Sequence, residues 1–134
     1  MQKDIFSLLN KISQAMFDKK GNNILALDVR PCHLLTDYVI IAEGDVDKHV
    51  IAIADAVQKT MEEEGWKVSF MQGMQTGDWV VLDYGQITIH LFVPSVREKY
   101  QLERLWHRSE IVDVIIDVPE RVPERVPEKR CLII

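Results

Sequence analysis

The sequence predicts a single α/β domain in which a mixed β-sheet of about five strands is flanked by helices. Helical and strand-like apolar patterns follow one another in the order α-β-β-α-β-β-β-α. The strand-like run 38–42, YVIIA, is continuously apolar, as expected of a strand with both faces buried. A strand-helix-strand crossover surrounds residues 46–64, and the run WVVLDYGQITIHLF at 79–92 indicates a hairpin. Parallel and antiparallel pairs should therefore share one sheet.

The first half of the chain supplies two helices and two strands. Apolar residues at helical spacing predict a helix over 4–20, which Gly21 should stop. Strands are predicted over 24–29 and 37–42. The second helix, 46–64, should have Asp45 as its N-cap and Gly65 as the residue just past its end.

The second half supplies three more strands and a third helix. A strand is predicted through Trp66, Val68 and Phe70, followed by the two strands of the hairpin. A two-residue loop at Tyr84-Gly85 would place Trp79 opposite His90. A capping box, Ser95 with Glu98, should start a helix that continues through Trp106 to about residue 108.

The C-terminal region has a different composition. VPER-VPER-VPEK repeats a four-residue unit whose prolines exclude a helix or a central strand. We therefore expect a folded domain over 1–114 and an extended, flexible tail over 115–134.

The predicted hairpin has two unlike faces. One is aliphatic, with Val80, Leu82, Ile87, Ile89 and Leu91. The other is a mixture of aromatic, polar and aliphatic residues, namely Trp79, Val81, Asp83, Gln86, Thr88, His90 and Phe92. Such a face is neither a normal core nor a normal solvated surface. Either helices of this chain or another molecule should cover it.

Composition excludes several classes of protein. The chain has 134 residues and 47% hydrophobic residues, enough for one domain with a core. The longest apolar run is far shorter than the ~20 residues of a membrane span, and no secretory signal pattern is present. We expect a cytoplasmic protein with free cysteines. The net charge of −5, without a Lys/Arg cluster, indicates a basic protein as partner better than nucleic acid or a membrane.

Catalytic motifs are weak or missing. The four histidines show no HExxH or paired spacing, and no nucleophile or phosphate-loop motif is found. Asp28, Asp37 and Asp83 follow or begin strands, where carboxylates can gather around a metal, but such aspartates are also ordinary turn residues. Gly44-Asp45 indicates a turn and a cap better than a phosphate site. We expect no enzyme, no metal and no cofactor.

Several sequence blocks resemble the bacterial ribosomal silencing factor family, also called the Iojap family. They are LDV, TDYVIIAEG, HVIAIAD, WVVLDYGQITIHLF and YQLERLW, and the likeness runs from about Asp4 to His107. The resemblance implies a non-enzymatic factor with a nucleotidyltransferase-like fold. It would bind the large ribosomal subunit through ribosomal protein L-fourteen, block association with the small subunit and repress translation under nutrient limitation.

The resemblance also implies where the partner binds. The family's contacts centre on the hairpin and the helix that follows it. Carried onto this chain, they are Trp79, Asp83, Tyr84, His90 and Phe92, with Tyr100, Leu102, Glu103 and Trp106 nearby. As a hypothesis, the aromatic anchors are Trp79 and Phe92. Acidic contacts would come from Asp83 and Glu103, and hydrogen bonds from Tyr84 and His90.

Two alternatives remain open. The chain could be a nucleotidyltransferase-like Mg²⁺-dependent enzyme that uses Asp28, Asp45 or Asp83. It could also be a homodimeric module that buries the Trp79 face against its twin. Gly44-Asp45-Val46 departs from the Gly-Thr/Asn-Ser pattern common in the family, so any role of that loop is in doubt.

Overall fold

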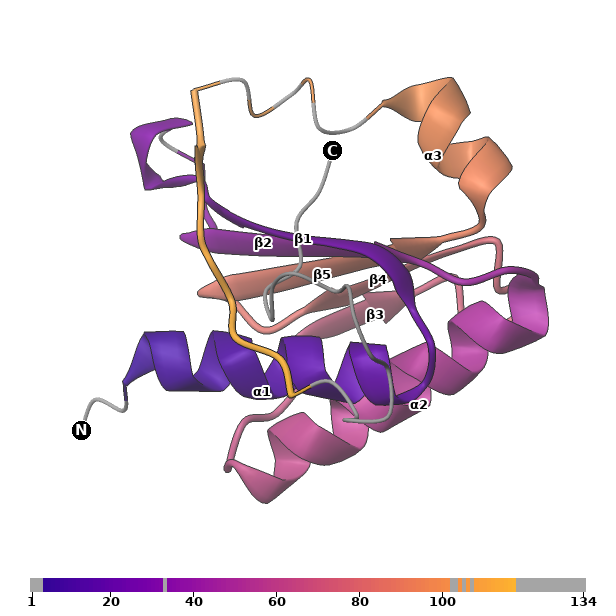
Figure 1. The fold of residues 1–134 in the computed structure, drawn as a ribbon, viewed down its shortest axis with the longest axis horizontal. Helices are drawn as coiled ribbons and strands as arrows, with labels where there is room; N and C mark the ends of the chain where they lie inside the picture. Colours follow the sequence, from indigo (N-terminus) through magenta and orange to yellow (C-terminus); the bar gives the residue numbers. More distant parts are fainter. Residues whose placement is uncertain (1–3, 33, 102–103, 105, 107, 118–134) are drawn as a thin grey trace.

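One six-stranded mixed sheet carries two helices on one face and a short helix on the other (Figure 1). The computed structural model describes residues 4–32, 34–101, 104, 106 and 108–117. The elements are α1 (Ile5–Asp18), β1 (Asn22–Asp28), η1 (Arg30–Cys32), β2 (Tyr38–Glu43), α2 (Asp47–Glu63), β3 (Phe70–Gln72), β4 (Trp79–Asp83), β5 (Ile87–Phe92), α3 (Pro94–Tyr100) and β6 (Glu110–Ile111). Together they confirm the predicted α/β fold.

The strand order β3-β4-β5-β2-β1-β6 explains the apolar run of β2, which lies inside the sheet and is almost fully buried. Strands β2 and β5 pair in parallel, and the chain that connects them includes the crossover helix α2. The other strand pairs are antiparallel. The predicted mixed sheet is therefore confirmed. The sixth strand, β6, was not predicted, since two residues are too short to show an alternating pattern.

The helices α1 and α2 cover the aliphatic face of the sheet (Figure 1). Their buried stripes meet the aliphatic side of the β4–β5 hairpin in one cluster, which includes Leu9, Ile12, Met16, Ile53, Val57, Met61, Val80, Leu82, Ile89 and Leu91. All of these side chains are fully buried. At roughly 1.5–3 kcal/mol for each large aliphatic side chain buried, this cluster is the main source of stability.

The hairpin register differs from the prediction by two residues. The N–H of Tyr84 donates to the carbonyl of Ile87 (2.8 Å), so the two-residue loop is Gly85-Gln86. Gly85 has a φ of 89°, a conformation that favours glycine at the first loop position. Trp79 consequently pairs with Phe92, and Val81 pairs with His90. Because the shift is an even number of residues, every side chain that stays in a strand keeps its predicted face, while Gln86 moves into the loop.

Three predicted helix boundaries are wrong in detail. Val46 rather than Asp45 is the N-cap of α2. The third helix has Val93 as N-cap and Pro94 as its first residue, which leaves Ser95 inside the first turn and excludes the capping box. This helix ends at Tyr100, because Gln101 adopts a left-handed conformation with a φ of 43°. By contrast, Gly65 follows α2 with a φ of 86°, as predicted.

Two further predictions need correction. The strand expected through Trp66 and Val68 begins only at Phe70; the two earlier residues pack as partly buried side chains against the helix-side core. The boundary at residue 114 is placed too early, since Ile116 is 1% exposed and belongs to that same core. The packed body therefore reaches residue 117, and the VPER repeats lie outside the described residues.

One buried polar atom in α1 has no partner. Ser13 is fully buried, and its hydroxyl makes no hydrogen bond in the structure. An unpaired buried hydroxyl costs free energy, and alanine is also the better helix former.

Ser13→Ala should therefore raise the free energy of unfolding, by about 0.5–1 kcal/mol in urea denaturation. Ser7→Ala, in the same helix but only half-buried, is the matched control for the change in helix propensity. A loss of stability for Ser13→Ala relative to Ser7→Ala would show that the hydroxyl has a partner after all.

Candidate partner-binding face

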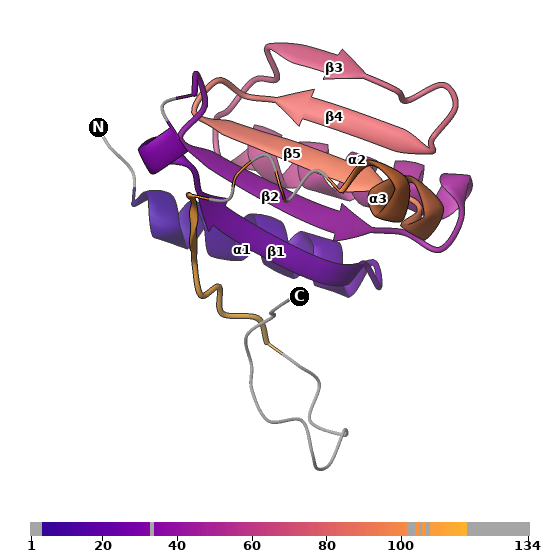
Figure 2. The same cartoon turned by 90° about the horizontal axis from the view of Figure 1, so that it is seen from above.

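The face of the sheet opposite α1 and α2 is only partly covered. In Figure 2, α3 lies over the ends of β5 and β2, while no described helix lies in front of β3 and β4. We call this uncovered area the open face. Strand alternation and register place on it Phe70, Val81, Asp83, Thr88 and His90, together with Trp79 and the neighbouring Tyr100 of α3.

An aromatic cluster forms the centre of the open face. The Trp79 ring meets Tyr100 at a centroid distance of 5.2 Å and Phe92 edge-on at 6.0 Å. His90 lies 6.2 Å from the Trp79 ring and 5.8 Å from the ring of Trp106. Such pairs contribute about 0.5–1.5 kcal/mol each beyond the burial of their area. The cluster therefore holds Trp79, which is half-buried, in one position.

A hydrogen bond fixes the state of the His90 ring. The indole Nε1–H of Trp79 donates to His90 Nδ1 at 3.2 Å. Nδ1 must then be unprotonated, so the proton of the neutral ring sits on Nε2. Burial lowers the pKa of His90 from 6.5 to about 4, and the nearby Asp83 carboxylate offsets only part of this effect. At neutral pH the ring is therefore uncharged and accepts the indole proton.

A buried ion pair places α3, and Tyr100 with it, beside Trp79. Arg97 Nη1 lies 3.2 Å from Glu43 Oε2 and donates to the carbonyl of Asn23 at 2.8 Å. The two charged side chains are 8% and 12% exposed. The guanidinium also lies 5.9 Å from the centre of the Phe92 ring. Removing one partner of such a pair leaves an uncompensated charge, so this contact strongly fixes the position of the helix.

The residues predicted as partner contacts divide into four groups. Trp79, Asp83, His90 and Tyr100 lie on the open face. Phe92 and Trp106 belong to a second core cluster on the same side of the sheet, at 0% and 7% exposure. They are therefore buried, and they pack against the rings of Trp79 and His90. Tyr84 lies on the other side of the sheet: it is 6% exposed and belongs to the helix-side core, because it follows Asp83 and strand residues alternate. Leu102 and Glu103 lie outside the described residues.

Sequence reasoning missed Phe70. This side chain is 54% exposed, pairs with Asp83 across the β3–β4 ladder and therefore points to the open face. The signal that could have found it is an exposed aromatic on an edge strand next to the hairpin. The predicted strand grouped it with Trp66 and Val68, which pack toward the helices.

The three aspartates considered for an Mg²⁺-dependent enzyme, Asp28, Asp45 and Asp83, each have a local hydrogen-bond partner. Asp28 accepts from Arg30 at 2.9 and 2.7 Å, and this bonding lowers its pKa. The Asp83 carboxylate accepts from the Gly85 N–H, and Asp45 accepts from Asn22. Within the described residues, no three His, Cys, Asp or Glu side chains gather as metal ligands. These aspartates behave as ordinary turn and ion-pair residues.

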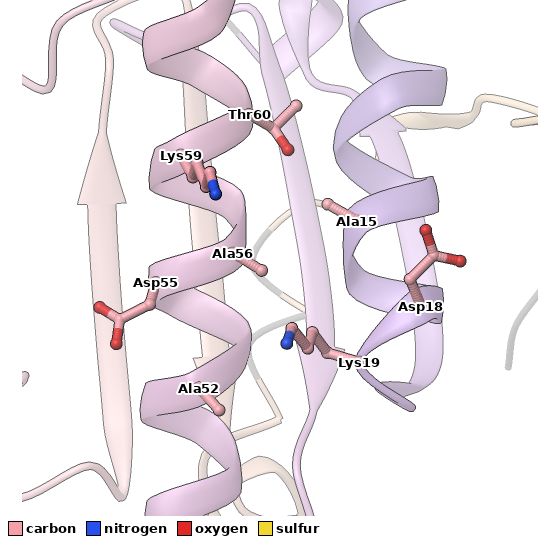
Figure 3. A pocket seen from close by; sticks show the side chains of 8 residues that line it. All are labelled: Ala15, Asp18, Lys19, Ala52, Asp55, Ala56, Lys59 and Thr60. Atoms are coloured by element: carbon pink, nitrogen blue, oxygen red, sulfur yellow. The ribbon is translucent and has the colours of Figure 1, made fainter.

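A groove of about 480 Å³ runs between α1 and α2 (Figure 3). Its floor is formed by small side chains, including Ala15, Ala52 and Ala56, and charged residues stand along its rim. No histidine or cysteine lines it.

In the described part of the chain, no helix is both long and apolar enough to cross a membrane.

The fold and the open face define a class of protein: an α/β domain that leaves an aromatic cluster partly exposed on one face of its sheet. The family model "Ribosomal silencing factor during starvation" matches residues 2–130. The chain therefore belongs to the ribosomal silencing factor family, as its sequence blocks suggested. This is a family of translation regulators, named for a regulatory rather than a catalytic role.

Individual relatives agree with this assignment. The Bacillus subtilis protein "Ribosomal silencing factor RsfS" is 36% identical over 81% of this chain and 92% of its own. Mouse "Mitochondrial assembly of ribosomal large subunit protein 1" is 29% identical over 77% of this chain and 45% of its own. A crystal structure of a Chromobacterium violaceum protein covers 78% of this chain and 88% of its own with a TM-score of 0.75 and 32% identity. A Bacillus halodurans crystal structure has a TM-score of 0.71 at 31% identity, over 81% and 98% of the two chains.

The His90 pKa predicts how stability depends on pH. Between pH 6.5 and 4 the folded protein binds fewer protons at this ring than the unfolded chain, so unfolding takes up a proton and becomes easier as the pH falls. When the pH falls from 7 to 5, proton uptake at His90 on unfolding should lower the free energy of unfolding by roughly 2 kcal/mol.

Urea denaturation of the wild type and of His90→Asn at both pH values measures this contribution. The asparagine oxygen can still accept the indole proton but does not titrate. The wild type should lose about 2 kcal/mol more than the variant between pH 7 and 5. Equal losses would mean that His90 is not a buried, neutral acceptor.

Proposed function

We propose that this protein binds the large ribosomal subunit with the open face, through ribosomal protein L-fourteen, and so prevents the small subunit from joining. Translation would then fall when nutrients are limiting. The observation that carries the proposal is the fixed aromatic cluster around Trp79 on a sheet face that α1 and α2 leave uncovered. Membership of the ribosomal silencing factor family supports it, and so does the ribosomal large subunit in the name of the mouse relative.

The proposed contacts follow from exposure and position. Tyr100 is 51% exposed and Phe70 is 54% exposed, so both can bury area against a partner without unfolding the domain. Trp79 is in contact with Tyr100 and is held by its neighbours, which lowers the entropy lost on binding. Rigid aromatic groups at the centre of a surface are the usual hot spots of protein interfaces.

Charge supports a basic partner. The chain carries a net charge of −5, and Asp83 stands on the open face between the exposed Phe70 and the hairpin loop. Its side chain already accepts the Gly85 N–H with one oxygen, Oδ1. The other oxygen would be available for a Lys or Arg of the ribosomal protein. Such a rim contact contributes more to orientation and association rate than to affinity.

Replacing exposed aromatics on the open face should weaken binding to isolated large subunits. Phe70→Ala and Tyr100→Ala should each raise the dissociation constant at least about fivefold, and Trp79→Ala about 30-fold. Co-sedimentation in sucrose gradients measures this. Phe70 and Tyr100 test the proposal cleanly, because Trp79 also holds the cluster together and its loss could destabilise the fold.

Phe6→Ala is the matched control. Phe6 is an aromatic of similar exposure, 50%, but it lies on α1, on the opposite side of the sheet. The Phe6→Ala variant should bind large subunits as tightly as the wild type does. If Phe70→Ala and Tyr100→Ala also bind normally, the open face is not the ribosomal contact. Variants that bind less tightly but elute as altered oligomers would instead support the homodimer alternative.

A further inference from the structure

The segment that follows β6 packs at the other edge of the sheet, away from the open face. Here residues 112–117, which we call the strap, leave β6 and cross to α1 (Figures 1 and 2). Their side chains alternate between exposed and buried, so the strap is extended like a bound peptide. Val114 and Ile116 are each 1% exposed, whereas Ile115 between them is 63% exposed.

Carboxamides of α1 recognise the backbone of the strap. Asn10 Oδ1 accepts the N–H of Ile115 at 3.0 Å. Gln14 Oε1 accepts the N–H of Asp117 at 2.7 Å, and Gln14 Nε2 donates to the carbonyl of the same residue at 3.3 Å. At Asp117, the amide of Gln14 thus makes the two backbone hydrogen bonds that a neighbouring strand would otherwise make. Asp18 accepts a second proton from Gln14 Nε2 at 2.8 Å and so fixes the orientation of the amide.

The sheet edge completes the site. The N–H of Val112 donates to the carbonyl of Ala26 in β1 at 2.9 Å, and β6 pairs with β1 just before it. Every polar contact named here is to the main chain of the strap and does not depend on its side chains. Val114 and Ile116 are its two fully buried side chains, and selection would act at the positions that receive them. These are the elements by which proteins bind an extended peptide as an added strand.

We propose that α1 and the edge of β1 form a binding groove for an extended peptide with β-branched residues at alternate positions. The strap fills the groove within its own chain, and the same segment of a second copy is the partner that fits it. A tethered ligand has an effective concentration of about millimolar, so the strap of the same chain keeps the groove closed unless it is released. Exchange of identical segments is a known low-cost route between monomers and dimers.

The test releases the strap without changing its sequence. A cleavage site for a sequence-specific protease is inserted between Arg108 and Ser109 of the full chain. After cleavage, the C-terminal piece should stay with the body on size exclusion. A fluorescently labelled synthetic peptide of residues 109–117 should then replace it, seen as a rise in anisotropy. The uncleaved protein should bind the peptide at least about tenfold more weakly.

Two peptides provide the matched control, with no risk of unfolding the protein. Ile115→Asp in the peptide changes an exposed residue and should leave binding unchanged. Ile116→Asp changes the neighbouring buried residue and should abolish binding. In the protein, Asn10→Ala with Gln14→Ala should weaken binding of the unchanged peptide about tenfold or more, since three backbone hydrogen bonds are lost.

Several outcomes would overturn the proposal. If the cleaved body unfolds, or if the C-terminal piece does not exchange with the peptide, the strap is an integral part of the core and not a ligand. Equal binding of the two aspartate peptides would mean that no groove selects alternate residues. Refolding two differently tagged intact chains together at high concentration should give mixed dimers that excess peptide suppresses; monomers alone would exclude the second copy as partner.

Discussion

The buried contact between Arg97 and Glu43 determines which part of this sheet is left uncovered. It ties α3 to the ends of β1 and β2, where the guanidinium also reaches the backbone of Asn23. The helix of seven residues is therefore held over one end of the second sheet face. Since α1 and α2 both lie on the first face, no other described helix can cover β3 and β4. The arrangement buries Phe92 and Trp106, supports Trp79 and leaves Phe70 and Tyr100 exposed.

The two faces of the sheet thus have different physical roles. Aliphatic packing against α1 and α2 supplies most of the stability, and it depends on few directional contacts. On the other face, directional contacts dominate: the indole–imidazole hydrogen bond, the tilted aromatic pairs and the buried ion pair. Directional contacts fix the shape of a surface, and a surface of fixed shape loses less entropy when it binds.

Much of the fold could be predicted from the sequence, because its signals are periodic and local. The apolar stripes of α1 and α2, the buried strand β2 and the two faces of the hairpin all depend on residues close in the chain. Predictions failed where a distant contact decides the outcome. Ile116 is core only because α1 and β1 receive it, and Gly85 rather than Tyr84 begins the hairpin loop because the β4–β5 pairing sets its position. Likewise, the exposure of Phe70 depends on the place of β3 at the sheet edge.

The candidate site was predictable only in part for the same reason. Trp79, Asp83 and His90 could be assigned to one face from strand alternation alone. Neither the burial of Phe92 and Trp106 nor the neutral state of His90 follows from that pattern, since both depend on the segments that cover them.

The central claim, that the open face is the ribosomal contact, is tested most directly by hydrogen–deuterium exchange of the protein, free and bound to isolated large subunits. Our account predicts slower exchange in β3, β4, the hairpin loop and α3, with α1 and α2 unchanged. Slower exchange confined to α1 and α2 would contradict it.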